Sequence, residues 1–207
     1  MVTEIIFDVE TKKLFSDIET DDPADLGVSV VSVYRRIVSD DLREKEGVMK
    51  SFWDPEAPRG PYIPDMWAWF EEADRIIGFN SRHFDIHALR PYYQKDFSQL
   101  KHFDIMDFVR AGVGRKIPLD LLSQYTLGQN KTDKGINAVY YWAKRDRQSL
   151  EKLQRYCEAD VRITKDLYDA GLKKGELKYL DRQNRVVSFS VDFSYPKIIE
   201  NPQIGLF

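Results

Sequence analysis

The stretch VTEIIFDVET, residues Val2–Thr11, joins a hydrophobic run to a pair of carboxylates. Its first part, Val2–Asp8, is rich in β-branched and aromatic residues, which predicts a strand that ends at its first carboxylate. Asp8 and Glu10 are two residues apart, so on extended backbone their side chains project from the same face. Carboxylate oxygens suit a hard divalent cation, and the stretch therefore predicts a metal-binding edge of a sheet.

A second Asp-x-Glu pair, Asp17 and Glu19 in SDIET (Ser16–Thr20), has the same spacing. It does not follow a hydrophobic run, and it lies in an acidic segment together with Asp21, Asp22 and Asp25. Such a segment is typical of a solvated loop. We therefore choose Asp8 and Glu10 as the candidate metal ligands.

A further carboxylate lies in GFNSRHFDIHAL, residues Gly78–Leu89. This segment follows the hydrophobic strand predicted over Arg75–Phe79, which places Asn80 and Asp85 at the C-terminal edge of a sheet, where sites on α/β folds form. Asp85 could equally serve as the N-cap of the helix that follows. The local sequence leaves both interpretations open.

Two histidines flank this carboxylate and raise the question of a zinc site. His83 and His87 are four residues apart, but the pattern His-Glu-x-x-His is absent and His102 is the only other histidine. We therefore expect surface histidines rather than zinc ligands.

The third cluster is YCEAD, residues Tyr156–Asp160, within a long helix predicted from about Arg147 to Ala170, with Gly171 as its stop. Tyr156 and Asp160 are four residues apart and so share one helical face. A phenol beside a metal-binding carboxylate can orient an attacking water. Taken alone, the cluster also fits a packed tyrosine and a solvated aspartate.

The order of the elements indicates an α/β fold. Strands over Leu26–Arg36 and Val48–Trp53 extend the first one into an antiparallel meander, and alternating strands and helices follow. The later elements expected are a loop over Asp54–Pro64, helices over Asp65–Asp74, Phe84–Lys95 and Leu119–Leu127, and strands over His102–Asp107 and Val186–Phe193, the last paired with Leu177–Leu180. The sequence thus predicts a mixed sheet, with parallel strands after the meander, flanked by helices.

Composition limits the function classes. The 207 residues fit one domain over residues 1–207, and 31 basic against 34 acidic residues give a net charge of −3, which excludes a uniformly cationic surface. Bound divalent ions would restore positive potential locally. Cys157 is the only cysteine, so no intrachain disulfide is expected, and the absence of long apolar runs predicts a soluble cytoplasmic protein without membrane contact.

Taken together, the three clusters resemble the exonuclease motifs of the DEDD superfamily, in its tyrosine-bearing DEDDy branch, on a ribonuclease H-like fold. FDVET resembles the first motif, Asn80 and Asp85 with FDIHAL the second, and YCEAD the third. The chain is similar to the proofreading exonuclease domains of family-B DNA polymerases and to small predicted exonucleases of the YprB type. The resemblance covers about residues 2–170 and leaves 171–207 as an extension, with strands expected in it.

The resemblance implies a metal-dependent 3′→5′ exonuclease that hydrolyses single-stranded DNA or RNA to nucleoside monophosphates. It implies two Mg²⁺ or Mn²⁺ ions, bridged by Asp8, with Glu10 and Asp160 completing one site and Asp85 holding the other. Tyr156 would position the water. The residues implied in binding the 3′ end of the single strand are Val9, Glu10, Thr11 and Asn80.

Other expectations are less specific. The candidate phosphate contacts are Arg110, Arg115, Lys116, Lys131 and Lys134, and Asp104 is expected to be structural. A structure-specific endonuclease and a catalytically inactive nucleic-acid-binding module are the alternatives on the same fold. The sequence does not identify a helicase or polymerase partner.

Overall fold

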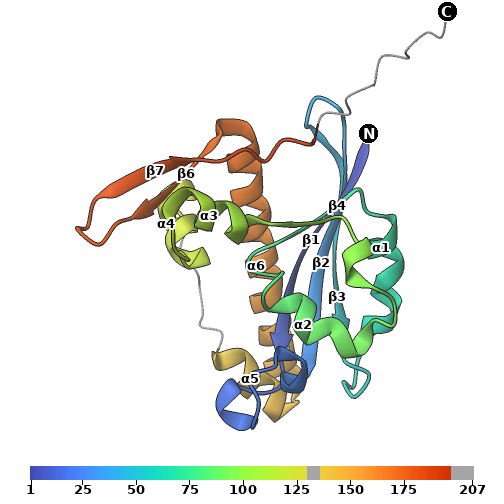
Figure 1. Cartoon of the computed structure of the whole chain (residues 1–207). Helices are drawn as coiled ribbons and strands as arrows, with labels where there is room; N and C mark the ends of the chain where they lie inside the picture. Colours follow the sequence, from blue (N-terminus) through green and yellow to red (C-terminus); the bar gives the residue numbers. More distant parts are fainter. Residues whose placement is uncertain (130–135, 197–207) are drawn as a thin grey trace, which may run out of the picture.

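The computed structural model describes residues 1–129 and 136–196, and its centre is a mixed sheet (Figure 1). Within the described residues the sheet has five strands in the order β3-β2-β1-β4-β5. β1 pairs antiparallel with β2, and β2 with β3, whereas β1–β4 and β4–β5 are parallel. The predicted α/β class, with a meander followed by parallel strands, is therefore confirmed. The bounds are Val2–Thr11 (β1), Val28–Val38 (β2), Glu44–Trp53 (β3), Arg75–Gly78 (β4) and His102–Asp104 (β5).

The strand β1 does not end at Asp8, as the sequence predicted. It continues to Thr11 because β2 pairs with it over its whole length, with Asp8 opposite Ser32 and Glu10 opposite Val30. An irregularity in the register follows between Glu10 and Thr11. Both carboxylates therefore lie on paired, rigid backbone rather than on a loop.

Alternation along β1 decides which face each side chain occupies. Ile5 and Phe7 pack with the cluster that contains Phe70 of α1 (Trp67–Glu72) and Leu89 of α2 (Asp85–Leu89). Ile6 packs on the opposite face with Val161 of α6 (Arg147–Lys174). Asp8 and Glu10 share the register of Ile6, and so they face α6.

Helices α3 (Ile105–Val113), α4 (Leu119–Leu127) and α5 (Ile136–Lys144) connect the sheet to α6. α4 has the predicted bounds and ends at Gly128, whose φ of 72° suits a glycine. α3 and α5 were not predicted. The strand expected over His102–Asp107 stops at Asp104. The Asp104 side chain accepts a hydrogen bond from Met106 N and so caps the start of α3.

Three predicted helices have other bounds in the structure. The helix expected over Asp65–Asp74 is α1, which covers only Trp67–Glu72 and follows a 3₁₀ turn over Ile63–Met66. α2 covers only Asp85–Leu89, because Pro91 falls in a 3₁₀ turn over Arg90–Tyr92. α6 does not stop at Gly171 but continues to Lys174 and ends at Gly175, where φ is 67°. A Cβ on Gly171 would lie 2.3 Å from Cε2 of Phe193, so this glycine makes room for an aromatic ring.

The chain after α6 forms a hairpin of β6 (Glu176–Leu180) and β7 (Val186–Ser190). The strands pair antiparallel as a separate two-stranded sheet, as the predicted pairing required, and do not extend the main sheet. Figure 1 shows the hairpin projecting beside α3 and α4. In the described part of the chain, no helix is both long and apolar enough to cross a membrane.

A buried polar network lies where β1 begins, at the sheet end remote from Asp8 and Glu10. The Arg36 guanidinium contacts the Glu4 carboxylate at 2.7 Å and the Asp169 carboxylate at 2.6 Å. Tyr168 donates a hydrogen bond to Glu4, and Arg75 donates to Tyr168 and to the carbonyl of Phe193. The network ties β1, β2, β4 and α6 to the segment that follows β7.

Candidate metal centre and nucleic-acid site

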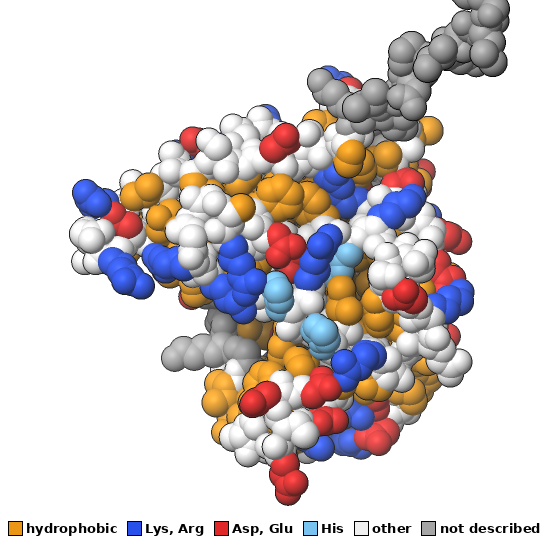
Figure 2. All heavy atoms as spheres, in the orientation of Figure 1, with side chains coloured by type: hydrophobic (Ala, Val, Ile, Leu, Met, Phe, Trp, Pro, Cys, Tyr) orange, Lys and Arg blue, Asp and Glu red, His pale blue; other side chains and the backbone are white. Residues whose placement is uncertain are grey.

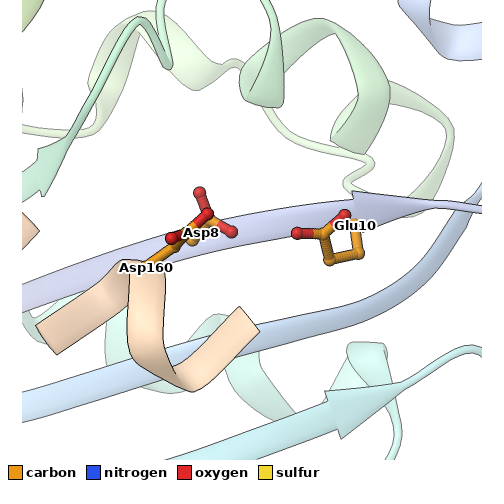
Figure 3. A group of neighbouring side chains, drawn as sticks. All are labelled: Asp8, Glu10 and Asp160. Atoms are coloured by element: carbon orange, nitrogen blue, oxygen red, sulfur yellow. The ribbon is translucent and has the colours of Figure 1, made fainter. Parts of the chain in front are cut away.

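Three of the predicted ligands converge. Asp8 and Glu10 from β1 and Asp160 from α6 each offer an oxygen, and these oxygens lie within 4.8 Å of one another (Figure 3). Two oxygens on opposite sides of one Mg²⁺ would be about 4.2 Å apart, since each bond is about 2.1 Å. The three carboxylates therefore fit a hard divalent cation after a small contraction.

Cys157 fixes the position of α6 against β1 at this point. Its buried thiol donates to the backbone carbonyl of Asp8 at 3.4 Å and lies 3.7 Å from Oδ2 of the same residue. Asp160, one turn further along α6, is 5% exposed. The fold thus holds a carboxylate of α6 over β1 in an environment with little water, where charges interact strongly.

Tyr156 lies beside these carboxylates and is itself buried. Burial raises the pKa of its phenol well above the usual value, and the charges of Asp160, Glu10 and Asp8 and a hydrogen bond with Asp160 raise it further. The phenol is therefore protonated over the physiological range. Tyr156 can hold and orient a polar group by hydrogen bonding.

Asp85 lies at the first position of α2, where its carboxylate is buried. The N-cap position of α2 belongs to Phe84, so the interpretation of Asp85 as a helix cap was wrong. Burial raises the pKa of Asp85 to about 7, the charge of Asp104 raises it too, and the Val9 amide opposes the shift. A bound cation would favour the charged form of this carboxylate.

Asn80 precedes Asp85 in a strained turn. Its φ is 60°, a left-handed conformation that asparagine tolerates better than most residues. The backbone N–H groups of Asn80 and Arg82 donate to the Asp104 carboxylate at 2.7 and 2.9 Å, which confirms the structural role expected for Asp104. Among the residues that the structure describes, the buried Oδ1 of Asn80 has no hydrogen-bond partner.

A cavity of about 430 Å³ opens beside the carboxylates. Of the predicted residues, it is lined by Asp8, Val9, Glu10, Asn80, Asp85, Lys116 and Asp160. Thr11 is not part of this lining, and its hydroxyl donates to the Lys13 carbonyl instead. The apolar wall of the cavity was not predicted, because its residues come from separate elements and carry no motif. They are Phe79, Phe84, Met106, Pro118 and Leu119.

The rejected candidates lie elsewhere. Asp17 is exposed, as expected, but it lies in a short 3₁₀ helix over Phe15–Asp17 rather than in a loop, and its carboxylate accepts a hydrogen bond from Leu14 N. His83 and His87 are exposed, which confirms the expectation of surface histidines. Lys131 and Lys134 lie outside the described residues.

A second cavity, of about 600 Å³, lies between the β2–β3 turn and α6. Its lining includes Arg36, Glu44 and Asp169, whose opposite charges already pair with one another. It offers no cluster of converging carboxylates within the described residues, so the smaller cavity is the better candidate site.

Comparisons with known proteins agree with this fold. A family model described as the RNase_H superfamily matches residues 14–171, and the chain belongs to this superfamily. The matched range includes Asp85 and Asp160 but begins after Asp8 and Glu10. No curated protein matches the chain.

Among solved structures, the chain resembles the family B DNA polymerase from the hyperthermophilic archaeon Pyrobaculum calidifontis, with a TM-score of 0.59 and 18% identity. The match covers 83% of this chain and 25% of that polymerase, so the chain spans about a quarter of its relative's length. The resemblance to family-B DNA polymerases stated from the sequence is thereby confirmed at the level of the fold. Together with the family, this likeness indicates a nuclease-type fold.

Proposed function

We propose that the protein is a metal-dependent 3′→5′ exonuclease that hydrolyses single-stranded DNA or RNA to nucleoside monophosphates. The observation that carries the proposal is the convergence of Asp8, Glu10 and Asp160, with oxygens within 4.8 Å of one another, beside a cavity that Asp85 also lines. The likeness of the fold to a family-B DNA polymerase supports it.

The carboxylates hold two Mg²⁺ or Mn²⁺ ions in this proposal. Asp8 and Glu10 from β1, Asp160 from α6 and Asp85 from α2 would hold these ions. The bound ions supply charge stabilisation to the entering and leaving oxygens of an in-line displacement and lower the pKa of the attacking water. Tyr156, which is buried beside the carboxylates, would orient that water through its phenol.

The cavity selects a terminal nucleotide. Its volume of about 430 Å³ falls within the usual range for small-ligand sites, roughly 300–1,000 Å³. Glu10 and the backbone at Val9 contact the terminal 3′-hydroxyl, and the Asn80 Oδ1, buried without a partner among the described residues, accepts a hydrogen bond from the substrate. Among the described residues, Lys116 is the one cation of the lining, and it meets a phosphate.

An oligonucleotide labelled at either end tests the proposal. With Mg²⁺ or Mn²⁺, a 5′-labelled single strand should shorten stepwise from its 3′ end and release monophosphates. Asp8→Ala should abolish the shortening, whereas Asp17→Ala should leave it unchanged, because Asp17 belongs to the exposed pair with identical spacing. Shortening from the 5′ end, or full turnover by Asp8→Ala, would contradict the assignment.

Two further measurements separate the alternatives on the same fold. A circular single strand offers no 3′ end, so an exonuclease leaves it intact and an endonuclease opens it. Calorimetric titration with Mn²⁺ distinguishes a catalytic site from an inactive binding module, since the module would take up no metal. DNA and RNA substrates of matched sequence show which nucleic acid is preferred.

A further inference from the structure

The β6–β7 hairpin lies beyond the matched residues 14–171 and is fixed to helices that frame the cavity. Phe189 of β7 packs over Gly112 of α3, where an added Cβ would lie 2.6 Å from its ring. Thr126 of α4 exchanges hydrogen bonds with the backbone of Lys178 in β6, at 2.8 and 3.1 Å. The hairpin therefore has a defined position relative to Lys116 and Leu119, which line the cavity.

Basic side chains connect the cavity to the hairpin. Lys116 lines the cavity, and its neighbour Arg115 places its guanidinium 5.6 Å from the centre of the Tyr179 ring of β6. Arg110, in the last turn of α3, lies 2.7 Å from the His83 ring nitrogen. Within residues 1–129 and 136–196, none of these three cations forms an ion pair with a carboxylate.

The hairpin continues this basic run. Arg182 is exposed in the turn, three residues beyond Tyr179, and it too forms no ion pair among the described residues. Its neighbour Arg185 is instead paired with Asp181 at 2.9 Å. Figure 2 shows Lys and Arg side chains gathered from the free end of the hairpin toward the histidines in the middle of the view.

This concentration of charge contrasts with the chain as a whole, whose net charge is −3. Uncompensated cations on one surface attract phosphate groups by releasing their counterions. The surface leads away from the carboxylates, so it suits a chain whose terminal nucleotide occupies the cavity. Guanidinium groups beside an aromatic ring also accept stacked bases.

We propose that Arg110, Arg115, Lys116 and Arg182 form a basic track that binds the phosphates of a single strand several nucleotides to the 5′ side of the scissile bond. The direction of the strand rests on the proposed function, which places the 3′ end in the cavity. The recognised chemistry is the phosphodiester backbone, which DNA and RNA share. In this proposal the hairpin helps to bind the substrate strand. A strand long enough to reach the hairpin therefore binds more tightly than a trinucleotide.

Binding of fluorescein-labelled oligo(dT) and oligo(U), of 3 and 12 nucleotides, tests the track in EDTA, where no hydrolysis occurs. We expect Arg182→Ala to weaken binding of the 12-nucleotide strands and to make the slope of log K against log salt shallower by about 0.7, the value for one phosphate contact on a single strand. Binding of the 3-nucleotide strands should not change. Arg182 is exposed at a turn, so its removal leaves the fold intact.

Lys45→Ala is the matched control, because Lys45 is exposed at the start of β3, at the sheet end opposite to the carboxylates. Equal affinities of Arg182→Ala and Lys45→Ala for the 12-nucleotide strands would overturn the track, as would an equal loss on both lengths. A loss confined to DNA or to RNA assigns the track to that nucleic acid. If the protein hydrolyses oligonucleotides but Arg182→Ala binds the 12-nucleotide strands normally, only the basic track is contradicted. If binding depends on Arg182 and strand length but no hydrolysis occurs, only the exonuclease assignment is contradicted.

Discussion

The backbone N–H of Asn80 donates a hydrogen bond of 2.7 Å to the carboxylate of Asp104, which comes from a different strand of the sheet. The same carboxylate accepts from the N–H groups of Arg82 and Met106, both at 2.9 Å. Asp104 does not line the cavity, yet it fixes the turn that presents Asn80 and Asp85. One buried side chain thus joins the start of α3 to the turn that lines the cavity.

Asp104→Asn should therefore impair both stability and activity. An amide places an NH₂ group against backbone donors, and leaving a buried donor unsatisfied costs about 1–3 kcal/mol. Displacement of the turn should lower kcat/KM by about tenfold or more. The control is Asp107→Asn. The Asp107 carboxylate is partly exposed and pairs with Arg82 at 3.6 Å, so this substitution should lower the free energy of unfolding by less than about 1 kcal/mol. Urea unfolding and oligonucleotide hydrolysis measure the two effects; equal behaviour of both variants would refute the role of Asp104.

Adjacent arginines on β2 should differ sharply in their contribution to stability. Arg36→Ala leaves the buried Glu4 carboxylate without its cation, which should cost about 3–5 kcal/mol. Arg35→Ala removes a looser pair with Glu72, at 3.9 Å, and should cost about 1 kcal/mol or less. Chemical denaturation of both variants checks the difference. Similar free energies of unfolding would show that the buried network does not stabilise the fold.

The stability of the protein should depend on the protonation of His102. Burial lowers the pKa of His102 to about 3, from 6.5, while Ser81 Oγ lies 2.8 Å from its Nε2. The unfolded chain therefore binds more protons than the folded chain between pH 6.5 and 3. As the pH is lowered through this range, the free energy of unfolding should decrease by up to about 1.4 kcal/mol per pH unit.

Asp85 acts in the opposite direction in this range, since its pKa is raised to about 7 and the folded chain holds the extra proton. The difference between the wild type and His102→Gln isolates the histidine. We expect this difference in unfolding free energy to shrink as the pH falls from 7 to 5. A constant difference would show that His102 titrates normally in the folded protein.

Removing a carboxylate from the candidate metal centre should raise the stability of the metal-free protein and lower the stability of the protein with bound metal. Without divalent ions, Asp8→Asn should raise Tm, because it relieves repulsion among carboxylates whose oxygens lie within 4.8 Å of one another. With Mn²⁺ at 100 times its Kd, the wild type should gain about 2.7 kcal/mol, and the variant much less. Thermal unfolding with and without Mn²⁺ measures both effects. Asp17→Asn should show neither, and the same Mn²⁺ response in Asp8→Asn would argue against a metal centre there.

Much of the candidate site was predictable because its signals are local. Asp8 and Glu10 share a strand face through a spacing of two, and Tyr156 and Asp160 share a helix face through a spacing of four. The convergence of Asp160 with the β1 pair was a prediction from resemblance, and the structure places these three oxygens together. The end of α4 was predictable because Gly128 marks it directly in the sequence.

The remaining differences come from contacts that are distant in sequence. Gly171 looks like a helix stop, but α6 continues past it because Phe193, 22 residues later, packs where a Cβ would be. β1 extends to Thr11 because β2 continues to pair with it. The apolar wall of the cavity combines residues of several elements, such as Phe84 and Leu119, which no local pattern relates.

Because Cys157 is buried beside the candidate metal centre, the reactivity of its thiol reports on local opening at that centre. Cys157 is the chain's single cysteine, and its thiol is enclosed between α6 and the Asp8 backbone. A reagent can alkylate Cys157 in the native protein only when α6 separates from β1. The labelling rate therefore measures how often these two elements separate beside the carboxylates. Fluorophores attached through cysteines introduced on the hairpin would consequently need no prior removal of the natural thiol.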